Sequence, residues 1–444
     1  MGCSSRDLSR NQIALVEIGV VETQGSRPRA NLIRLIGPVG EFDAERKALL
    51  LHYGSPAAFK KIDATDPVDV SHDGQRMEIC SETGWFTYHV DPIGCRDIDD
   101  AIAYNRETGE TAITIADATA YVALGSDVDR TACSIGATFY NLEGGVEIPM
   151  LPKTISEDAA SLTPGKRRRG VTLIVDRKGQ ETFVLSWITV QHSYTYESAD
   201  DGMDFGLTLS LEGNVDLDSH KMIETLMLRY NTAAARLLKK NGVGILRAQP
   251  AADAAKVLEW ASVDPSLANE AATYVAVTDG VDTSHASLNV DAYCHASSPI
   301  RRYADLVNQR CLKRIIAGRG GPTDSGEAFV THLNLRAKAN RRWSRDLTFL
   351  THVTPGRVHY IDIVWISPDQ FWVPEWKRIV RARHQRPVTV GTDGVSTPVT
   401  KDTVAIFCDP TKRNWKSRIL TAQGNQDTTI QDDLPPCIPN TTPA

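Results

Sequence analysis

An acidic segment of ten residues constrains this chain more than any other feature, because it crowds four aspartates between two apolar runs. The aspartates are Asp91, Asp97, Asp99 and Asp100. The flanking runs, residues 85–90 and 101–104, alternate in the manner of β-strands. In extended chain, residues two apart share a face at a separation of about 6.6 Å, so we expect Asp97 and Asp99 to point one way and Asp100 the other. A turn after Asp91 would return that side chain to the cluster.

Carboxylates held this close together repel one another and raise one another's pKa values unless a cation lies among them. Oxygen ligands suit a hard divalent ion, so the segment predicts a site for Mg²⁺, with Mn²⁺ as an alternative, rather than for zinc. The other interpretation is an acidic turn without metal, since Asp side chains often satisfy backbone groups in loops. The sequence around the segment favours the metal site.

Composition excludes several classes of protein. The 444 residues, 41% hydrophobic and 23% charged, are enough for two or three soluble domains, and no apolar stretch approaches the roughly 20 residues that a bilayer requires. The eight cysteines include no Cys-x-x-Cys pair, which predicts a cytoplasmic or other intracellular reducing compartment without structural zinc or disulfides. The net charge of -6 conceals a basic stretch, because residues 336–386 hold eleven Lys and Arg against four Asp and Glu.

Changes in hydrophobic periodicity divide the chain into four parts and indicate an α+β fold class. Residues 1–83 have an uncertain fold, either a remnant RNA-binding barrel or a docking arm. Residues 84–350 mix strand hairpins with helices, as expected of a mixed sheet covered by helices. Residues 351–425 carry five or six short, aromatic-rich strands, which predict a small barrel of the oligonucleotide-binding type. The polar, proline-bearing residues 426–444 are expected to be disordered.

Three long helices are predicted in the part that follows the acidic segment. Apolar residues at helical spacing predict one helix over residues 219–240, capped by Asp218 or Ser219, and another over residues 327–350. Between them, a helix is expected to begin at Pro299 with Ser298 as its cap, because proline is favoured in the first turn of a helix.

Three motifs follow one another in a fixed order within residues 84–350. The first comprises residues 89–91, 97–102 and 115–117, the second runs from Tyr140 through 148–152 to 156–162, and the third is HASSPIRRYADL at 295–306. Together they closely resemble the motifs of the ribonuclease II (RNB) family of hydrolytic 3′→5′ exoribonucleases. The resemblance implies an RNB-type catalytic domain, a mixed sheet with helices, over roughly residues 84–350.

The resemblance also implies a set of site residues. Asp91, Asp97, Asp99 and Asp100 would bind Mg²⁺ or Mn²⁺ in a two-metal hydrolysis, with Asp97, Asp99 and Arg301 as catalytic residues. Asp99 is the carboxylate on which the family's chemistry depends most. If Arg301 lies in the first turn of its helix, its guanidinium can bind two phosphate oxygens at once. The alternative for Arg301 is an ion pair with Asp305 one helical turn later.

Single-stranded RNA is the partner that the resemblance implies, and protein partners cannot be inferred. The candidates for RNA contact are Tyr140, Arg302, Arg167, Arg168, Arg378 and Arg381. Tyr140 would stack on a base, or else belong to the core. Arg302 would bind the RNA backbone or be structural, and the basic run 166–169 would be a solvated loop or a phosphate contact. Arg378 and Arg381 stand among tryptophans, which suits either a single-strand track or a barrel core.

These features predict an exoribonuclease that degrades single-stranded RNA to nucleoside 5′-monophosphates. The alternative is a catalytically weak RNA-binding scaffold or regulatory protein that keeps the same fold. Two departures from the family bear on this choice: the first 88 residues are too short for two cold-shock-type barrels, and Ser344 falls where bacterial members carry a glutamate. No Gly-x-x-x-x-Gly-Lys-Ser/Thr loop is present, which excludes a P-loop nucleotide-driven machine.

Overall fold

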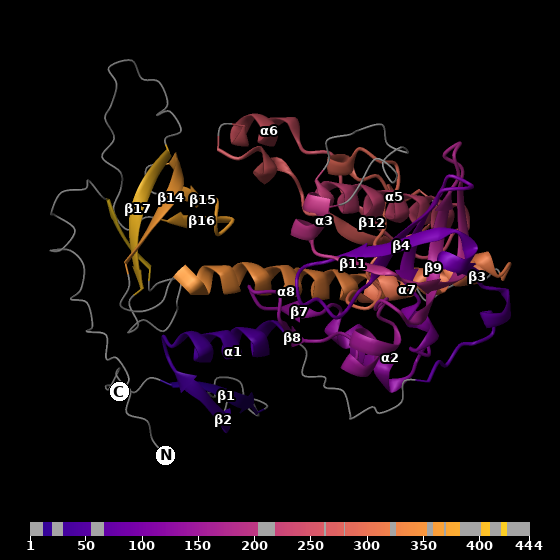
Figure 1. Cartoon of the computed structure of the whole chain (residues 1–444). Coiled ribbons are helices and arrows are strands. Elements are labelled where there is room, and N and C mark those ends of the chain that lie inside the picture. The colour runs from indigo at the N-terminus through magenta and orange to yellow at the C-terminus, as the bar shows by residue number, and fades with distance from the viewer. Residues whose placement is uncertain are drawn as a thin grey trace.

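Figure 1 shows the chain as a computed structural model. It describes residues 12–19, 30–54, 66–202, 218–261, 263–278, 280–319, 326–352, 358–367, 370–381, 401–408 and 419–423. In this part of the chain, no helix is both long and apolar enough to cross a membrane.

A seven-stranded mixed sheet lies at the centre of the fold, in the order β11-β4-β5-β6-β9-β10-β3. Its strands are β3 (Met77–Ile79), β4 (Trp85–Val90), β5 (Asp100–Asn105), β6 (Glu110–Ala116), β9 (Arg167–Val175), β10 (Glu181–Thr189) and β11 (His192–Tyr194). The middle strands are antiparallel, whereas β3 and β11 pair in parallel at the two edges. The mixed sheet and its two hairpins, β5–β6 and β9–β10, confirm the predicted α+β class.

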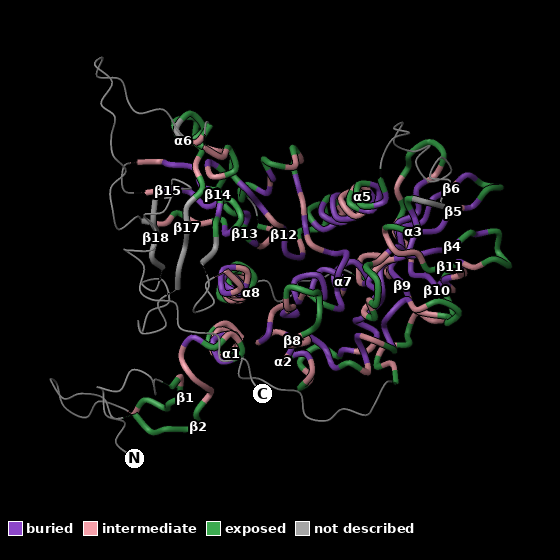
Figure 2. Tube along the Cα trace, turned by 60° about the vertical axis from the view of Figure 1, so that its left-hand side comes forward, coloured by how far each residue is buried: buried purple, intermediate pink, exposed green. Residues whose placement is uncertain are grey.

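The central part also contains six described helices, of which α5 and α7 pack against the sheet. They are α2 (Asp127–Ile135), α3 (Tyr196–Gly202), α5 (Ser219–Lys240), α6 (Ala254–Trp260), α7 (Tyr303–Ile316) and α8 (Glu327–His352). Ile102 of β5 packs in one core with residues of α5, whereas its neighbours Ala101 and Ala103 pack in a second core with residues of α7. Figure 2 shows that α7 is largely buried and that α5 has both buried and exposed residues. The cap of α5 is Asp218, whose carboxylate accepts from the backbone N–H of Lys221.

Short elements complete the central part. They are the strand pairs β7 (Phe139–Tyr140) with β8 (Val146–Ile148) and β12 (Ile245–Ala248) with β13 (Thr273–Ala276), the 3₁₀ turns Asp73–Gln75, Ser81–Thr83, Ala118–Ala120, Pro265–Ala268 and Ala286–Leu288, and the π-helical turn Thr154–Ala159.

The helix predicted from Pro299 begins later than expected, at Tyr303. Residues 136–138 lie against the preceding backbone: Thr138 N–H donates to the carbonyl of Arg301, and Tyr303 N–H donates to the carbonyl of Gly136. Arg302 is therefore extended, with φ −134° and ψ 127°. Arg301 lies in a turn before the helix, so the predicted role of first-turn amides beside Arg301 is wrong.

The two ends of the chain pack around α8, which extends from the central sheet to the C-terminal strands (Figure 1). At the N-terminal end are β1 (Gln12–Ile18), β2 (Ala30–Pro38) and α1 (Phe42–Tyr53), and at the C-terminal end β14 (Val358–Ser367), β15 (Gln370–Val373), β16 (Arg378–Arg381), β17 (Lys401–Cys408) and β18 (Ile419–Gln423). Tyr53 of α1 donates to Asp346 of α8 at 2.6 Å. Phe349 of α8 packs in one core with Phe371 and Trp376.

The C-terminal strands form an antiparallel sheet in the order β16-β15-β14-β17-β18. Trp372 and Trp376 are buried, as expected of barrel core. Closure into a barrel stays a prediction, as do the four domain boundaries. The strand expected at residues 387–390 and the tail 426–444 lie outside the described residues.

The buried side-chain amide of Asn308 in α7 stabilises the backbone around the site. Its Oδ1 accepts from Ile245 N–H, and its Nδ2 donates to the carbonyls of Ile245 and His295. Asn308→Ala leaves these backbone groups without partners, so we expect the free energy of unfolding to fall by about 2–4 kcal/mol in urea titrations. The exposed Asn269→Ala should change it by less than about 0.5 kcal/mol. Equal effects of the two substitutions would contradict this assignment.

Candidate active site

One cavity of about 870 Å³ collects the residues of all three motifs. Asp91, Asp97, Asp99 and Asp100 line it together with Tyr140, Arg301 and Arg302. The expectation that Asp100 points away from its neighbours is wrong. Strand β5 begins only at Asp100, and the residues before it are not in a strand. Strict alternation therefore does not apply, and all four carboxylates reach one cavity.

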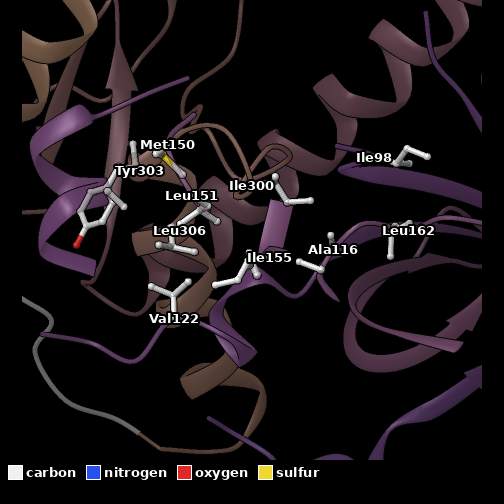
Figure 3. Close-up of a cluster of buried hydrophobic side chains, with 14 of the residues drawn as sticks. Ile98, Ala116, Val122, Met150, Leu151, Ile155, Leu162, Ile300, Tyr303 and Leu306 are labelled. Carbon is white, nitrogen blue, oxygen red and sulfur yellow. The ribbon is translucent and has the colours of Figure 1, made fainter. Parts of the chain in front are cut away.

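Asp99 joins the first motif to the third. Its Oδ1 accepts a hydrogen bond from Ile300 N–H at 2.9 Å, and its Oδ2 accepts one from Arg301 Nε at 3.0 Å. The neighbours Ile98 and Ile300 belong to one apolar core and fix the backbone on both sides of this contact (Figure 3). Asp99 is 3% exposed, whereas the Arg301 side chain is 45% exposed. Arg301 is thus anchored at Nε while the rest of its guanidinium faces the cavity.

The alternative ion pair of Arg301 with Asp305 is not formed. Asp305 instead accepts from Arg302 Nη2 and from Ser298 N–H, both at 2.8 Å. Consecutive arginines therefore contact different carboxylates, as expected for an extended residue at position 302.

Tyr140 holds the side chain of Asp97 in place. Its hydroxyl donates to Asp97 at 2.8 Å, and its backbone carbonyl accepts from the Trp343 indole of α8 at 2.7 Å. Tyr140 is half-buried and lines the cavity, so it is not an ordinary core tyrosine. Burial and the Asp97 carboxylate raise the pKa of Tyr140, which keeps its proton available for this hydrogen bond.

His89 belongs to the first motif, and in the structure it lies against Asp91. The two residues lie two apart on one face at the end of β4, and His89 Nδ1 is 2.8 Å from Asp91 Oδ2. His89 is buried, and its Nε2 has no hydrogen-bond partner among the described residues. Asp91 is further fixed by its N–H, which donates to the carbonyl of Tyr194.

Burial and mutual repulsion raise the pKa values of two of the carboxylates, Asp99 and Asp100. Burial raises the pKa of Asp99 to about 7, against a partial opposing effect of Arg301. The pKa of Asp100 is also raised well above its ordinary value, first by burial and then by the charges of Asp91 and Asp99. No described side chain donates a hydrogen bond to Asp100. A positive charge placed among these groups would relieve both the repulsion and the cost of desolvation.

The four carboxylates supply the oxygen ligands that a hard divalent ion prefers, although three of them already contact other side chains. Among the described residues, no three carboxylate, imidazole or thiolate groups converge closely enough to hold an ion as they stand. Asp97, Asp99 and Asp91 are engaged by Tyr140, Arg301 and His89. Ion binding would require these carboxylates to exchange or share hydrogen bonds. The ionised form of Asp100, which Asp91 and Asp99 repel, would be stabilised most by a bound ion.

The remaining RNA-contact candidates are not all at the cavity. Arg302 lines it, but Arg167 and Arg168 do not. The predicted solvated loop is wrong for both, because β9 begins at Arg167 and the pair bind Glu78 and Asp158. Pairing of residues 167–169 with β10 fixes them in the sheet.

At the C-terminal sheet, Arg378 binds Asp346, and its guanidinium lies 4.7 Å from the centre of the Phe349 ring. These contacts give Arg378 a structural role at the junction with α8. Arg381 ends β16, and its side chain is outside the described part. Ser344 is exposed on α8, does not line the cavity and contacts the carbonyl of Asn340.

Sequence reasoning missed several polar residues of the cavity, three of which have an aromatic or amide side chain. They are Tyr196, Asn231 and Tyr293. Tyr196 stacks on His220, with ring centres 3.7 Å apart and planes at 4°. Burial and the nearby Asp100 and Asp91 raise the pKa of Tyr196 to about 12. Their only signal in the sequence is an aromatic or amide side chain outside any motif, which also suits a core position.

Comparison with known proteins identifies relatives of this arrangement. The RNB domain family model matches residues 82–212 and 203–318. Exoribonuclease 2 of Aeromonas hydrophila is 27% identical over 354 aligned residues, covering 60% of this chain and 52% of the relative. For exoribonuclease 2 of Sodalis glossinidius the values are 26% over 372 residues, 63% and 57%. The chain thus spans about half the length of the curated relatives it matches.

Two solved structures share the fold. RNase R of Mycoplasma genitalium, in complex with ribose-methylated single-stranded RNA, has a TM-score of 0.68 at 16% identity and covers 89% of this chain and 80% of its own. Yeast Ssd1, described as a pseudonuclease, has a TM-score of 0.67 at 15% identity and covers 83% and 59%. At such identities the likeness concerns the fold alone.

The raised pKa of Asp99 predicts how the stability of the metal-free protein depends on pH. Its folded-state pKa of about 7 lies above its ordinary value of 3.8, so the folded state binds the proton more tightly than the unfolded state. The free energy of unfolding should therefore rise, on the order of 2 kcal/mol, as the pH falls from about 8 to about 5. Urea titrations in EDTA measure this rise, which Asp99→Asn should reduce. The same pH dependence in both proteins would refute the assignment.

Proposed function

Because this chain belongs to the RNB domain family, we propose that it is a metal-dependent hydrolytic exoribonuclease. It degrades single-stranded RNA from the 3′ end and releases nucleoside 5′-monophosphates. The observation that carries the proposal is the contact of buried Asp99 with Arg301 in a cavity lined by three further aspartates. This contact supports the proposal because it joins Arg301, our candidate phosphate-binding residue, to Asp99, a candidate metal-binding carboxylate.

Asp91, Asp97, Asp99 and Asp100 would hold the ions, Mg²⁺ in our proposal and Mn²⁺ as the alternative. Bound divalent ions supply an activated water and stabilise the attacking and leaving oxygens of an in-line displacement. His89 orients the Asp91 carboxylate through their 2.8 Å contact. Tyr140 similarly orients Asp97 through its hydroxyl. These two contacts position the outer carboxylates before an ion arrives, and each carboxylate would share its hydrogen bond with the ion once the ion binds.

Arg301 binds the scissile phosphate. Its Nε is committed to Asp99 at 3.0 Å, so the guanidinium plane is fixed, and its terminal nitrogens are directed to the cavity. A fixed fork can bind two phosphate oxygens and stabilise the charge that grows on them in the transition state, with little reorganisation. Lys could not reproduce both contacts.

The ring of Tyr140 stacks on a base near the 3′ end in our proposal. Its hydrogen bonds to Trp343 and Asp97, which hold the residue at the cavity, support this role. Such stacking tolerates any base, as degradation of mixed sequences requires. We further propose that residues 351–425 bind RNA ahead of the cavity, and that the protein works in a reducing compartment. Among the side chains that the structure describes, those of Cys80, Cys95, Cys133 and Cys294 form no disulfide, which is consistent with the second point.

A second candidate function is RNA binding without turnover. The likeness to the yeast pseudonuclease Ssd1 favours it, because that fold exists without nuclease function. Against it stand the four aspartates and Arg301 in one cavity. A scaffold has no need of buried carboxylates that raise one another's pKa values.

Activity on end-labelled RNA distinguishes these candidates. Single-stranded RNA labelled at its 5′ or 3′ end is incubated with Mg²⁺, and we expect the 3′ label to be released at once as a mononucleotide. Asp99→Asn should reduce turnover at least about 100-fold, because it removes the charge that the ion requires. The matched control is Asp127→Asn, an exposed aspartate of α2, which should remain active. Activity that survives EDTA, or equal activity of wild type and Asp99→Asn, would refute the mechanism.

Arg301→Ala tests transition-state stabilisation. We expect kcat to fall about 100-fold with a much smaller change in KM, because the phosphate contact strengthens as charge develops. Arg301→Lys should restore little of this loss. Thermal unfolding of both variants controls for the loss of the Asp99 contact. A rise in KM with kcat unchanged would show that Arg301 only binds the substrate.

A further inference from the structure

A second cavity, of about 1030 Å³, shares no described residue with the one that contains the aspartates. One wall is a face of α7, because Tyr303, Val307, Arg310 and Arg314 follow one another at a spacing of three or four residues. The other walls come from the segment before β3, the segment between β6 and α2, and the start of α8. Its volume is close to the upper limit of the usual range for small-molecule sites, about 300–1,000 Å³.

Apolar side chains form part of the lining of this second cavity. Val122 and Val307 are buried, and the half-buried Phe329 packs edge-on against Tyr303 with ring centres 6.2 Å apart. Leu124, by contrast, lines the cavity with 73% of its surface exposed. Apolar and aromatic groups in a concave space favour a ligand that has an apolar or aromatic body.

Basic side chains form another part of the lining. They come from the second half of α7 and the segment after it, and they are Arg310, Lys313, Arg314 and Arg319. Two carboxylates, Asp69 and Asp129, also line the cavity and pair with Lys313 and Arg310. Among the described lining residues, basic groups thus outnumber carboxylates by four to two. This charge favours an anionic ligand.

Arg310 carries a guanidinium nitrogen that lacks a partner. Its Nη2 donates to Asp129 at 2.7 Å and to the carbonyl of Val122 at 3.1 Å. Asp129 is fixed in turn by the Tyr303 hydroxyl at 2.8 Å. The Arg310 side chain is 14% exposed, and its Nη1 is buried without a hydrogen-bond partner among the described residues. A buried donor without a partner is costly, and a phosphate oxygen in the cavity would satisfy it.

We propose that this second cavity binds a nucleoside phosphate, with the phosphate at Arg310 and Arg314 and the base against Phe329. The choice of a nucleotide rests on the proposed function, because a nucleoside 5′-monophosphate is the proposed product. Asp305 and Asn308, which support the active site, lie on the opposite face of α7. A nucleotide in the second cavity therefore stabilises the helix on which the active site is built.

Calorimetric titration of the full chain with AMP, adenosine and inorganic phosphate tests this site. The titrations are made in EDTA with the wild type and with Arg301→Ala, which lacks the candidate phosphate contact of the active site. We expect Arg301→Ala to bind one AMP per chain. Adenosine and inorganic phosphate should each bind at least about ten-fold more weakly than AMP, because each makes only part of the contacts. Equal binding of AMP and phosphate would identify a site for bare anions and overturn the proposal.

Two tryptophan substitutions form a matched pair. Ala328 and Ala255 are each the exposed second residue of a helix, α8 and α6, but only Ala328 lines the cavity. Ala328→Trp should weaken AMP binding at least about ten-fold, because the indole occupies the space of the ligand, whereas Ala255→Trp should bind as the wild type does. AMP should also raise the Tm of Ala255→Trp and not that of Ala328→Trp.

Arg310→Gln tests the phosphate contact. We expect AMP to bind about ten-fold more weakly, because a hydrogen bond to a charged group is lost. The control is Arg236→Gln, an exposed arginine of α5 that does not line the cavity. Thermal unfolding without AMP shows whether Arg310→Gln still folds, and Ala328→Trp keeps the basic residues in place if it does not.

AMP binding that persists in Ala328→Trp would overturn the proposal. Binding that disappears in Arg301→Ala would do so too, because all of the AMP would then lie in the active site. A protein that binds AMP in the second cavity but degrades no RNA would refute the proposed function and keep this site. An active exoribonuclease without this binding would do the reverse.

Discussion

The contact between Asp99 and the backbone of Ile300 is the interaction on which the candidate site depends. It joins two segments separated by 201 positions in the sequence, and it brings Arg301 to the same carboxylate. Ile98 and Ile300, the neighbours of this contact in the two segments, belong to one apolar core. The buried carboxylate carries a raised pKa as the cost of this arrangement.

The other carboxylates are held by separate supports. Asp97 is held by Tyr140, whose backbone is fixed by α8, and Asp91 by His89 at the end of β4. In the described part of the chain no side chain donates to Asp100, and its charge is repelled by Asp91 and Asp99. The cavity is therefore preorganised in position but carries an excess of negative charge, which bound divalent ions would offset.

Helices α7 and α8 connect this centre to the rest of the molecule. α7 carries Asp305 and Asn308, which fix the turn before it and the strand β12 beside it. α8 supports Tyr140 near its middle and the C-terminal sheet near its end. In our proposal, RNA bound by residues 351–425 then enters the cavity that contains the aspartates.

The sequence by itself determined the strands around the acidic segment, helix α5 with a cap at Asp218 or Ser219, and the aspartates, Tyr140 and two arginines that meet at the cavity. Local periodicity, capping and motif order encode these features directly. Only the tertiary structure decided the late start of α7, the orientation of Asp100, and the contacts of His89 and Tyr140. Each depends on a segment distant in sequence or on irregular backbone: residues 136–138 compete for the chain before Tyr303, and pairing with β10 draws Arg167 and Arg168 into a strand. Such contacts have no local signature, because they arise only when the sheet and helices have packed.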